Sequence, residues 1–110
     1  MSKDECLFCG YRKFDLVAEN EHTYAIRDKY PDTELHTLII TKKHYDEAFD
    51  LPSAEIVSIF ELAKRCQKDI LKQDKTVRGF NFKTNAGREA GQKICHVHFH
   101  LIPRREGNDL

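Results

Sequence analysis

The sequence predicts an α+β domain in which one long helix packs on an antiparallel sheet of about five strands. Three observations predict this fold class. One stretch, residues 50–72, repeats its apolar residues with the period of a helix. Several short stretches alternate apolar and polar residues with the period of a strand. No repeat or linker divides the 110 residues, so we expect a single domain over 1–110.

The first part of the chain is expected to form three strands, at residues 14–19, 22–27 and 36–41. Asn20 and Glu21 form a short turn, which makes the first two strands a hairpin. Residues 28–33 contain proline and aspartates and therefore form a loop. The third strand is apolar enough to lie at the centre of the sheet.

The helix is expected to run from about Asp50 to about Lys72. Asp50 is a candidate N-cap, and Pro52 is tolerated in a first helical turn. The apolar positions follow an i, i+3, i+4 pattern and predict a buried stripe of Ile56, Ile59, Phe60, Ala63, Cys66 and Ile70. Because Cys66 lies on this stripe, we interpret it as a core residue.

Apolar and polar residues alternate most clearly in the last part of the chain. Residues 80–84 predict a fourth strand, and a glycine-bearing loop at 85–92 leads into a final strand. In that strand His96, His98 and His100 alternate with apolar residues, so the three imidazoles share one face. An ordinary half-buried strand would explain the alternation. Histidine is uncommon on the polar face of such a strand, however, and its usual roles are proton transfer, nucleophilic attack and metal binding.

Composition excludes several function classes. The chain is 40% hydrophobic and 33% charged, with zero net charge, which is typical of a globular protein and gives no sign of nucleic-acid or membrane binding. Residues 76–105 nevertheless hold six basic side chains against one acidic side chain. The histidines therefore lie in the basic part of a neutral chain, which suits a small anionic ligand.

The N-terminus and the cysteines indicate the cellular compartment in which we expect the protein. No apolar run is long enough to span a bilayer, and residues 1–5 lack the apolar core of a signal peptide, so we expect a cytoplasmic protein. Reduced cysteines there favour metal binding or burial over disulfides. Cys6-x-x-Cys9 is compatible with half of a zinc site, a redox dithiol or two buried cysteines.

Taken together, these segments resemble the histidine triad (HIT) superfamily, whose signature is His-φ-His-φ-His-φ-φ with φ apolar. Residues 96–102 match this signature at every position. The family's phosphate loop is similar to Asn85-x-Gly87-x-x-x-Gly91-Gln92, and its ribose loop with an upstream histidine is similar to Asp28-x-x-Pro31 followed by His36. Cys6 and Cys9 resemble the zinc-binding branch.

The resemblance implies a HIT-like α+β fold, a homodimer and a nucleotide or nucleotide conjugate as substrate. It implies that His98 attacks the α-phosphate and forms a nucleotidyl-histidine intermediate, oriented by the backbone carbonyl of His96. His100 and His36 would contact the phosphate. Asp28 would accept hydrogen bonds from ribose hydroxyls.

The remaining implied residues bind phosphate or metal. Asn85, with the amides of Gly91 and Gln92, would hold phosphate oxygens. Lys93 stands where the family usually has serine or threonine, and it either neutralises a leaving phosphate or faces solvent. Lys29 replaces an apolar residue near the base, which leaves the preferred base open. The implied ligands of a structural Zn²⁺ ion are Cys6, Cys9, His44 and His96.

Two functions follow from these features. The first is a hydrolase that cleaves a nucleoside phosphoramidate, a dinucleoside polyphosphate or a related nucleotidyl ester. The alternative is a nucleotide-binding sensor or scaffold with little or no turnover, suggested by Lys29 and Lys93.

Overall fold

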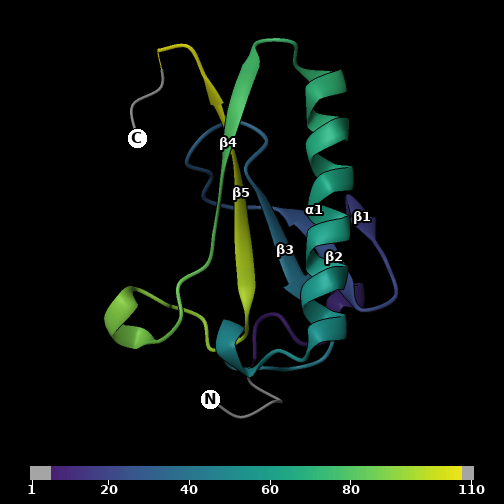
Figure 1. Cartoon of the computed structure of the whole chain (residues 1–110), viewed down its shortest axis with the longest axis vertical. Helices are drawn as coiled ribbons and strands as arrows, with labels where there is room; N and C mark the ends of the chain where they lie inside the picture. The colour runs from purple at the N-terminus through teal and green to yellow at the C-terminus, as the bar shows by residue number, and fades with distance from the viewer. Residues whose placement is uncertain (1–5, 108–110) are drawn as a thin grey trace.

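The predicted fold class is confirmed. The computed structural model describes residues 6–107, so the N-terminal residues 1–5 discussed above and residues 108–110 lie outside it. Its main elements are β1 (Ala18–Glu19), β2 (Thr23–Arg27), β3 (Thr37–Thr41), α1 (Ser53–Gln73), β4 (Val77–Lys83) and β5 (His98–Arg105). The five strands form one antiparallel sheet in the order β1-β2-β3-β5-β4, and α1 lies along one face of it (Figure 1).

The core has two parts, one on each face of the sheet. Between the sheet and α1, buried residues include Ile59, Leu62 and Ile70 of the helix with Ala25, Ile39 and Leu101 of the strands. On the opposite face, residues near the N-terminus cover β2 and β3, where the buried cluster is Cys6, Phe8, Tyr24, Ile26, Leu38 and Ile40. Both faces of these two strands are therefore covered, which explains why their sequences read as nearly continuous apolar runs. No helix in the described range 6–107 has the length and apolarity needed to cross a bilayer.

The helix differs from the prediction at its N-terminus. It begins at Ser53, with Pro52 as N-cap, while Asp50 lies in a preceding 3₁₀ turn and does not cap it. The Pro52 carbonyl accepts hydrogen bonds from the amides of Glu55 and Ile56. Proline fits this position because it can supply the first helical carbonyl while its own backbone stays extended.

Part of the predicted buried stripe is exposed. Ile59, Ala63, Cys66 and Ile70 are buried as predicted, but Ile56 and Phe60 keep 46% and 55% of their surface exposed. The Phe60 ring packs edge-on against Phe82 of β4, with 5.3 Å between the ring centroids. Because β4 is the last strand of the sheet, no further strand within residues 6–107 covers this side of the helix.

Two predicted strands are shorter than expected at their starts. Only Ala18–Glu19 of residues 14–19 pairs with β2, and β5 begins at His98, two residues after His96. The His96 amide donates to the Ile94 carbonyl, and the Val97 amide donates to the Tyr45 carbonyl. His96 therefore lies in a bend before the strand, and the alternation of the strand does not determine its orientation.

Candidate functional site

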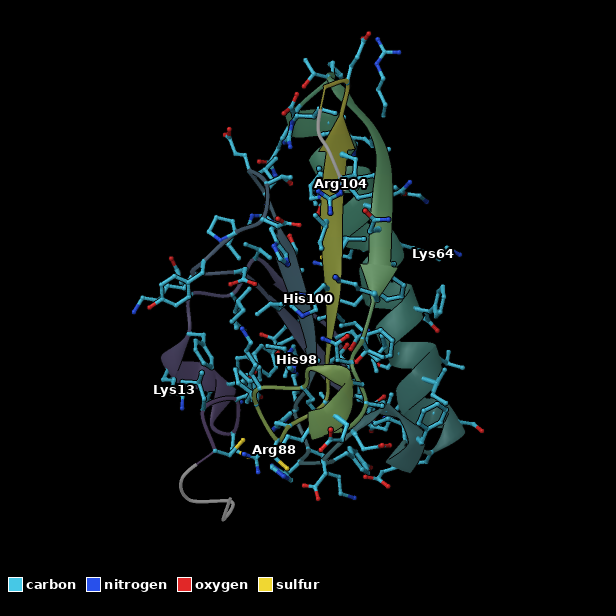
Figure 2. All side chains as sticks on the ribbon, turned by 90° about the vertical axis from the view of Figure 1, so that its left-hand side faces the viewer. Lys13, Lys64, Arg88, His98, His100 and Arg104 are labelled. Atoms are coloured by element: carbon cyan, nitrogen blue, oxygen red, sulfur yellow. The ribbon has the colours of Figure 1, made fainter. Side chains whose placement is uncertain are left out.

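His98 and His100 follow one another along β5, with Arg104 farther along the same strand (Figure 2). Phe99 and Leu101 pack into the core beneath α1. Because side chains alternate along a strand, His98 and His100 lie on the opposite face. Their ring centroids are 5.3 Å apart.

The His98 ring is held in one tautomer. Its Nδ1 lies 2.9 Å from the backbone carbonyl oxygen of His96. A carbonyl only accepts, so Nδ1 carries the proton and Nε2 keeps a free lone pair. Burial lowers the pKa of His98, against the opposing effect of this hydrogen bond. The result is a neutral imidazole with a free nitrogen, which is a competent nucleophile.

His36 and His100 form a hydrogen-bonded pair whose tautomers follow from their neighbours. The Asp32 amide donates to His36 Nδ1 at 3.0 Å, so this nitrogen is unprotonated. The proton of the neutral His36 ring is then on Nε2, which lies 2.9 Å from His100 Nδ1. His36 Nε2–H therefore donates to His100 Nδ1. The proton of the neutral His100 ring is then on Nε2, which is left as a donor. The Nε2–H donor of His100 thus lies beside the ring of His98, whose Nε2 is free. This pair suits a substrate in which an anionic oxygen is bound to an electrophilic atom.

Burial keeps both rings of this pair neutral. It lowers the pKa of His36, and the charges of Asp28 and Asp32 oppose the change. Burial also lowers the pKa of His100 to about 4, assisted by its neighbours His98 and His36. Asp28, whose side chain is 18% exposed, places Oδ2 at 3.4 Å from His36 Nε2 and accepts from the Tyr30 amide through Oδ1.

The glycine-bearing loop is closed by its own hydrogen bonds. The amide of Gly91 donates to Arg88 O, and the amide of Gln92 donates to Gly87 O. The Gln92 side chain accepts from the Gly87 amide at 2.8 Å and donates to Asp46 O at 2.6 Å. The predicted amide donors are thus already used within the loop, which differs from the expectation for a preformed phosphate cradle.

Two other predicted phosphate ligands border this loop. The Asn85 side-chain amide lies 3.5 Å from the Gly91 carbonyl oxygen, a long contact. Lys93 is exposed and has no hydrogen bond or ion pair within residues 6–107.

A second cluster brings together the four predicted metal ligands, Cys6, Cys9, His44 and His96. Cys6 Sγ lies 3.1 Å from His96 Nδ1, and Cys9 Sγ lies 3.2 Å from His44 Nδ1. Tetrahedral bonds to zinc separate sulfur and nitrogen ligands by about 3.5 Å. The cluster is therefore close to the size that a bound zinc ion requires.

The other nitrogen of each histidine supports the same donor set. His96 Nε2 donates to the Thr41 carbonyl at 2.8 Å, and His44 Nε2 donates to Asp46 Oδ1 at 3.0 Å. Nδ1 of each ring is then unprotonated and faces the thiols. This is the arrangement of metal-binding histidines, whose second nitrogen donates to a carbonyl or a carboxylate.

Sequence reasoning did not identify the residues that support these rings. Asp32 acts through its backbone amide, and Thr84 donates to the His98 carbonyl at 2.7 Å. Neither has a local signal in the sequence, because the contact depends on where distant strands meet. Asp46 has a weak signal, since it lies two residues from His44 and is able to accept from its ring.

Comparison with known proteins decides the family. Residues 12–107 match the HIT domain. The chain belongs to the HIT family. It is 36% identical over 105 residues to the adenosine 5′-monophosphoramidase of Saccharomyces cerevisiae, covering 92% of this chain and 63% of that protein.

Two solved HIT structures show the same fold. A HIT family protein from Bacillus anthracis has a TM-score of 0.88 at 36% identity, covering 98% of this HIT chain and 79% of that one. A Zn-bound histidine triad family protein from Mycobacterium smegmatis has a TM-score of 0.87 at 28% identity, covering 99% and 81% of the two chains. These similarities place the five strands and the long helix of this chain in the HIT fold.

The lowered pKa of His100 predicts a loss of stability in acid. The unfolded chain takes up a proton near pH 6.5, whereas the folded chain does so only near pH 4. The stabilising contribution of neutral His100 is thus present above pH 6.5 and is lost as the pH falls toward 4. Because the ring is partly exposed to solvent, which weakens such effects, we expect the contribution to be on the order of 2 kcal/mol.

Urea unfolding at several pH values tests this expectation. His100→Asn, which cannot titrate, should lose less stability than the wild type between pH 7 and pH 4. Identical pH dependence in the two proteins would contradict the prediction.

Proposed function

We propose that this HIT protein hydrolyses a nucleotidyl substrate at its α-phosphate, with His98 as the nucleophile. The observation that carries the proposal is the 2.9 Å contact between His98 Nδ1 and the His96 carbonyl, which leaves Nε2 free to attack. The substrate is a nucleoside phosphoramidate, a dinucleoside polyphosphate or a related nucleotidyl ester. The name of the yeast relative, an adenosine 5′-monophosphoramidase, supports this class.

The reaction has two steps in this proposal. The Nε2 lone pair of His98 forms a bond to phosphorus, and the leaving group departs with the electron pair of the broken bond; a leaving amine also takes up a proton from the solvent. Water then displaces His98 from phosphorus, releases one proton and restores the neutral imidazole. The Nδ1 proton stays on the ring in both steps, because the His96 carbonyl accepts its hydrogen bond throughout.

The neighbouring residues bind the substrate. Nε2–H of His100 donates to a phosphate oxygen, and His36 keeps His100 in the donating tautomer through their 2.9 Å contact. Asp28 accepts hydrogen bonds from the ribose hydroxyls.

The loop beside His98 supplies further phosphate contacts in this proposal. They come from Asn85, Lys93 and the amides of Gly91 and Gln92. Use of these two amides requires the loop to give up its internal hydrogen bonds to Arg88 and Gly87 when the substrate binds.

Removal of the nucleophile tests the proposal. His98→Ala should lower kcat for adenosine 5′-phosphoramidate and diadenosine tetraphosphate by at least about 10³-fold, because no other free imidazole nitrogen replaces Nε2. His22→Ala is the matched control, since His22 belongs to neither histidine cluster and pairs with Glu55.

Wild-type turnover retained by His98→Ala would contradict the assignment. Calorimetry with AMP distinguishes the hydrolase from the alternative function, a nucleotide-binding sensor or scaffold. A wild-type protein that binds AMP but cleaves neither substrate is a sensor or scaffold and not a hydrolase.

We further propose that Cys6, Cys9, His44 and His96 hold one structural Zn²⁺ ion. Two thiolates and two imidazoles complete a tetrahedral site and leave no position for substrate or water. The bound ion would stabilise the bend that holds the His96 carbonyl beneath the His98 ring. Thiolate ligands require reducing conditions, which agrees with a cytoplasmic location.

Metal analysis tests the zinc site. Purified wild-type protein should contain about one zinc per chain, and Cys9→Ser should lose both the zinc and thermal stability. Cys66→Ala is the control, because Cys66 belongs to α1, is buried in the core between helix and sheet, and is not part of the cysteine–histidine cluster. Stoichiometric zinc in Cys9→Ser would rule out this ligand set.

We also propose a homodimer formed at the free edge of β4 and the adjoining side of α1. An edge strand offers unpaired backbone groups to a second chain. Phe49, Ile56 and Phe60 are exposed by 88%, 46% and 55%, so a second copy would bury apolar surface there.

Sedimentation at several protein concentrations tests the dimer. Phe60→Glu should shift the protein toward the monomer, because dimerisation would bury the new charge. Lys68→Glu on the same helix is the control and should remain dimeric. Equal association of Phe60→Glu and the wild type would contradict the interface.

A further inference from the structure

Arg104 follows His98 and His100 along β5, on the same face of the sheet (Figure 2). Its side chain is only 18% exposed, and its guanidinium group has two partners. Nε donates to Asn81 Oδ1 at 2.7 Å, and Nη2 donates to Asp32 Oδ2 at 3.0 Å. Arg104 therefore connects β4 and β5 to the β2–β3 loop, residues 28–36, which contains Asp32.

The β2–β3 loop covers this part of β5. Ile102 lies between His100 and Arg104 on the same face and is only 1% exposed. The Thr33 hydroxyl donates to the Pro103 carbonyl at 2.7 Å, beside the contact between Asp32 and Arg104. Two neighbouring contacts thus attach the loop to the strand, and the one to Arg104 holds the residue whose amide faces His36.

Asp32 uses its two polar groups on different partners. Its carboxylate accepts from Arg104, while its amide donates to His36 Nδ1 at 3.0 Å. A backbone amide always carries its proton, so it excludes a proton from Nδ1 and leaves the ring proton on Nε2. His36 Nε2–H then donates to His100 Nδ1 at 2.9 Å. The hydrogen bonds therefore run in one direction, from the Asp32 amide through both rings to Nε2–H of His100.

The direction of these hydrogen bonds decides what His100 offers to a ligand. In the reversed arrangement His36 would carry its proton on Nδ1, and its Nε2 would accept from Nδ1–H of His100. His100 would then present a lone pair at Nε2, which repels an anionic phosphate oxygen, whereas Nε2–H binds it. The Asp32 amide therefore selects the arrangement that suits a phosphate.

Asp28 favours the same arrangement but is needed elsewhere. Its Oδ2 lies 3.4 Å from His36 Nε2, so it attracts the ring proton to that nitrogen. In the function proposed above, the ribose hydroxyls occupy this carboxylate when the substrate binds. The Asp32 amide is the contact that then remains on the His36 ring. The Asp28 backbone is held separately, because its amide donates to the His36 carbonyl at 2.9 Å and extends the pairing of β2 and β3.

We propose that Arg104 is a positioning residue, which holds Asp32 so that its amide keeps His36 and His100 in the tautomers that donate to the phosphate. The inference rests on the proposed function and adds to it a residue that does not touch the substrate. Every contact involved lies within one chain and none requires an exposed group, which is compatible with the dimer proposed above.

Kinetics separate this role from a general effect on the loop. Arg104→Met should lower kcat for adenosine 5′-phosphoramidate by about tenfold or more, because part of the protein then lacks the donor on His100. KM should change by less than about threefold, because Asp28 keeps its place. A variant that only disordered the loop would displace Asp28 and raise KM, and this result would overturn the proposal.

A double-mutant cycle tests whether Arg104 acts through Asp32. Asp32→Ala keeps the amide but loses the carboxylate, so it should lower kcat as much as Arg104→Met, and the double variant should lose no more. Thermal unfolding should change little, because an ion pair with a half-exposed carboxylate contributes little to stability. Additive losses in kcat would contradict a shared path.

Arg105→Met is the matched control. Arg105 also donates to a carboxylate, Asp74 Oδ2 at 2.9 Å, and to the same loop through the Glu34 carbonyl at 3.0 Å, but these partners do not include the Asp32 carboxylate. This variant should keep the wild-type kcat. Equal losses in Arg104→Met and Arg105→Met, or a wild-type kcat in Arg104→Met, would overturn the proposal.

Nuclear magnetic resonance keeps the test independent of turnover. In protein labelled with ¹⁵N-histidine, with AMP bound and the pH above the ordinary pKa of histidine, proton–nitrogen correlations show which ring nitrogen is protonated. Wild type and Arg105→Met should carry Nε2–H on His36 and His100, whereas Arg104→Met should show a mixture of tautomers. This shift in a wild type without turnover would reject the hydrolase and keep the positioning role. Unchanged tautomers in Arg104→Met would reject the positioning role alone.

Discussion

The hydrogen bond from His98 Nδ1 to the His96 carbonyl is the interaction on which the rest of the site depends. It selects the tautomer in which Nε2 keeps its lone pair. The bond exists because His96 lies in a bend just before β5, where its carbonyl does not belong to the regular ladder. The Val97 amide anchors this bend to Tyr45, outside the sheet. A carbonyl engaged in strand pairing would be less free to accept from a side chain.

The same bend connects the two histidine clusters. The His96 ring is fully buried and faces the thiol of Cys6, while its Nε2 donates to Thr41 at the end of β3. The residues around Cys6 also cover the second face of β2 and β3, where Phe8 packs edge-on against the His98 ring at 5.2 Å. The N-terminal segment thus contributes to the core, to the cysteine–histidine cluster and to the burial that keeps His98 neutral.

Burial, rather than a strong base, prepares these imidazoles. His98, His36 and His100 all have pKa values below the usual value, with burial as the largest cause. A protonated ring would lose its lone pair, so low pKa values keep the nitrogens available at neutral pH.

The sequence by itself determined the fold class, the family and the identity of both clusters. Periodicity was sufficient for α1 and for the central strands, because their burial on the sheet imposes that period. The histidine signature and the Cys-x-x-Cys pair identified side chains that the structure brings together from positions up to 90 residues apart. Their chemical roles remain predictions.

The tertiary structure determined the burial, orientation and tautomers of several side chains that the local sequence pattern does not encode. Ile56 and Phe60 fit a buried stripe, yet they are exposed because the sheet ends at β4. His96 fits the strand alternation, yet it lies in a bend and faces the cysteines. The tautomers of His36 and His100 depend on the Asp32 amide. Each of these facts arises from the pairing of distant segments, which hydrophobic periodicity does not encode.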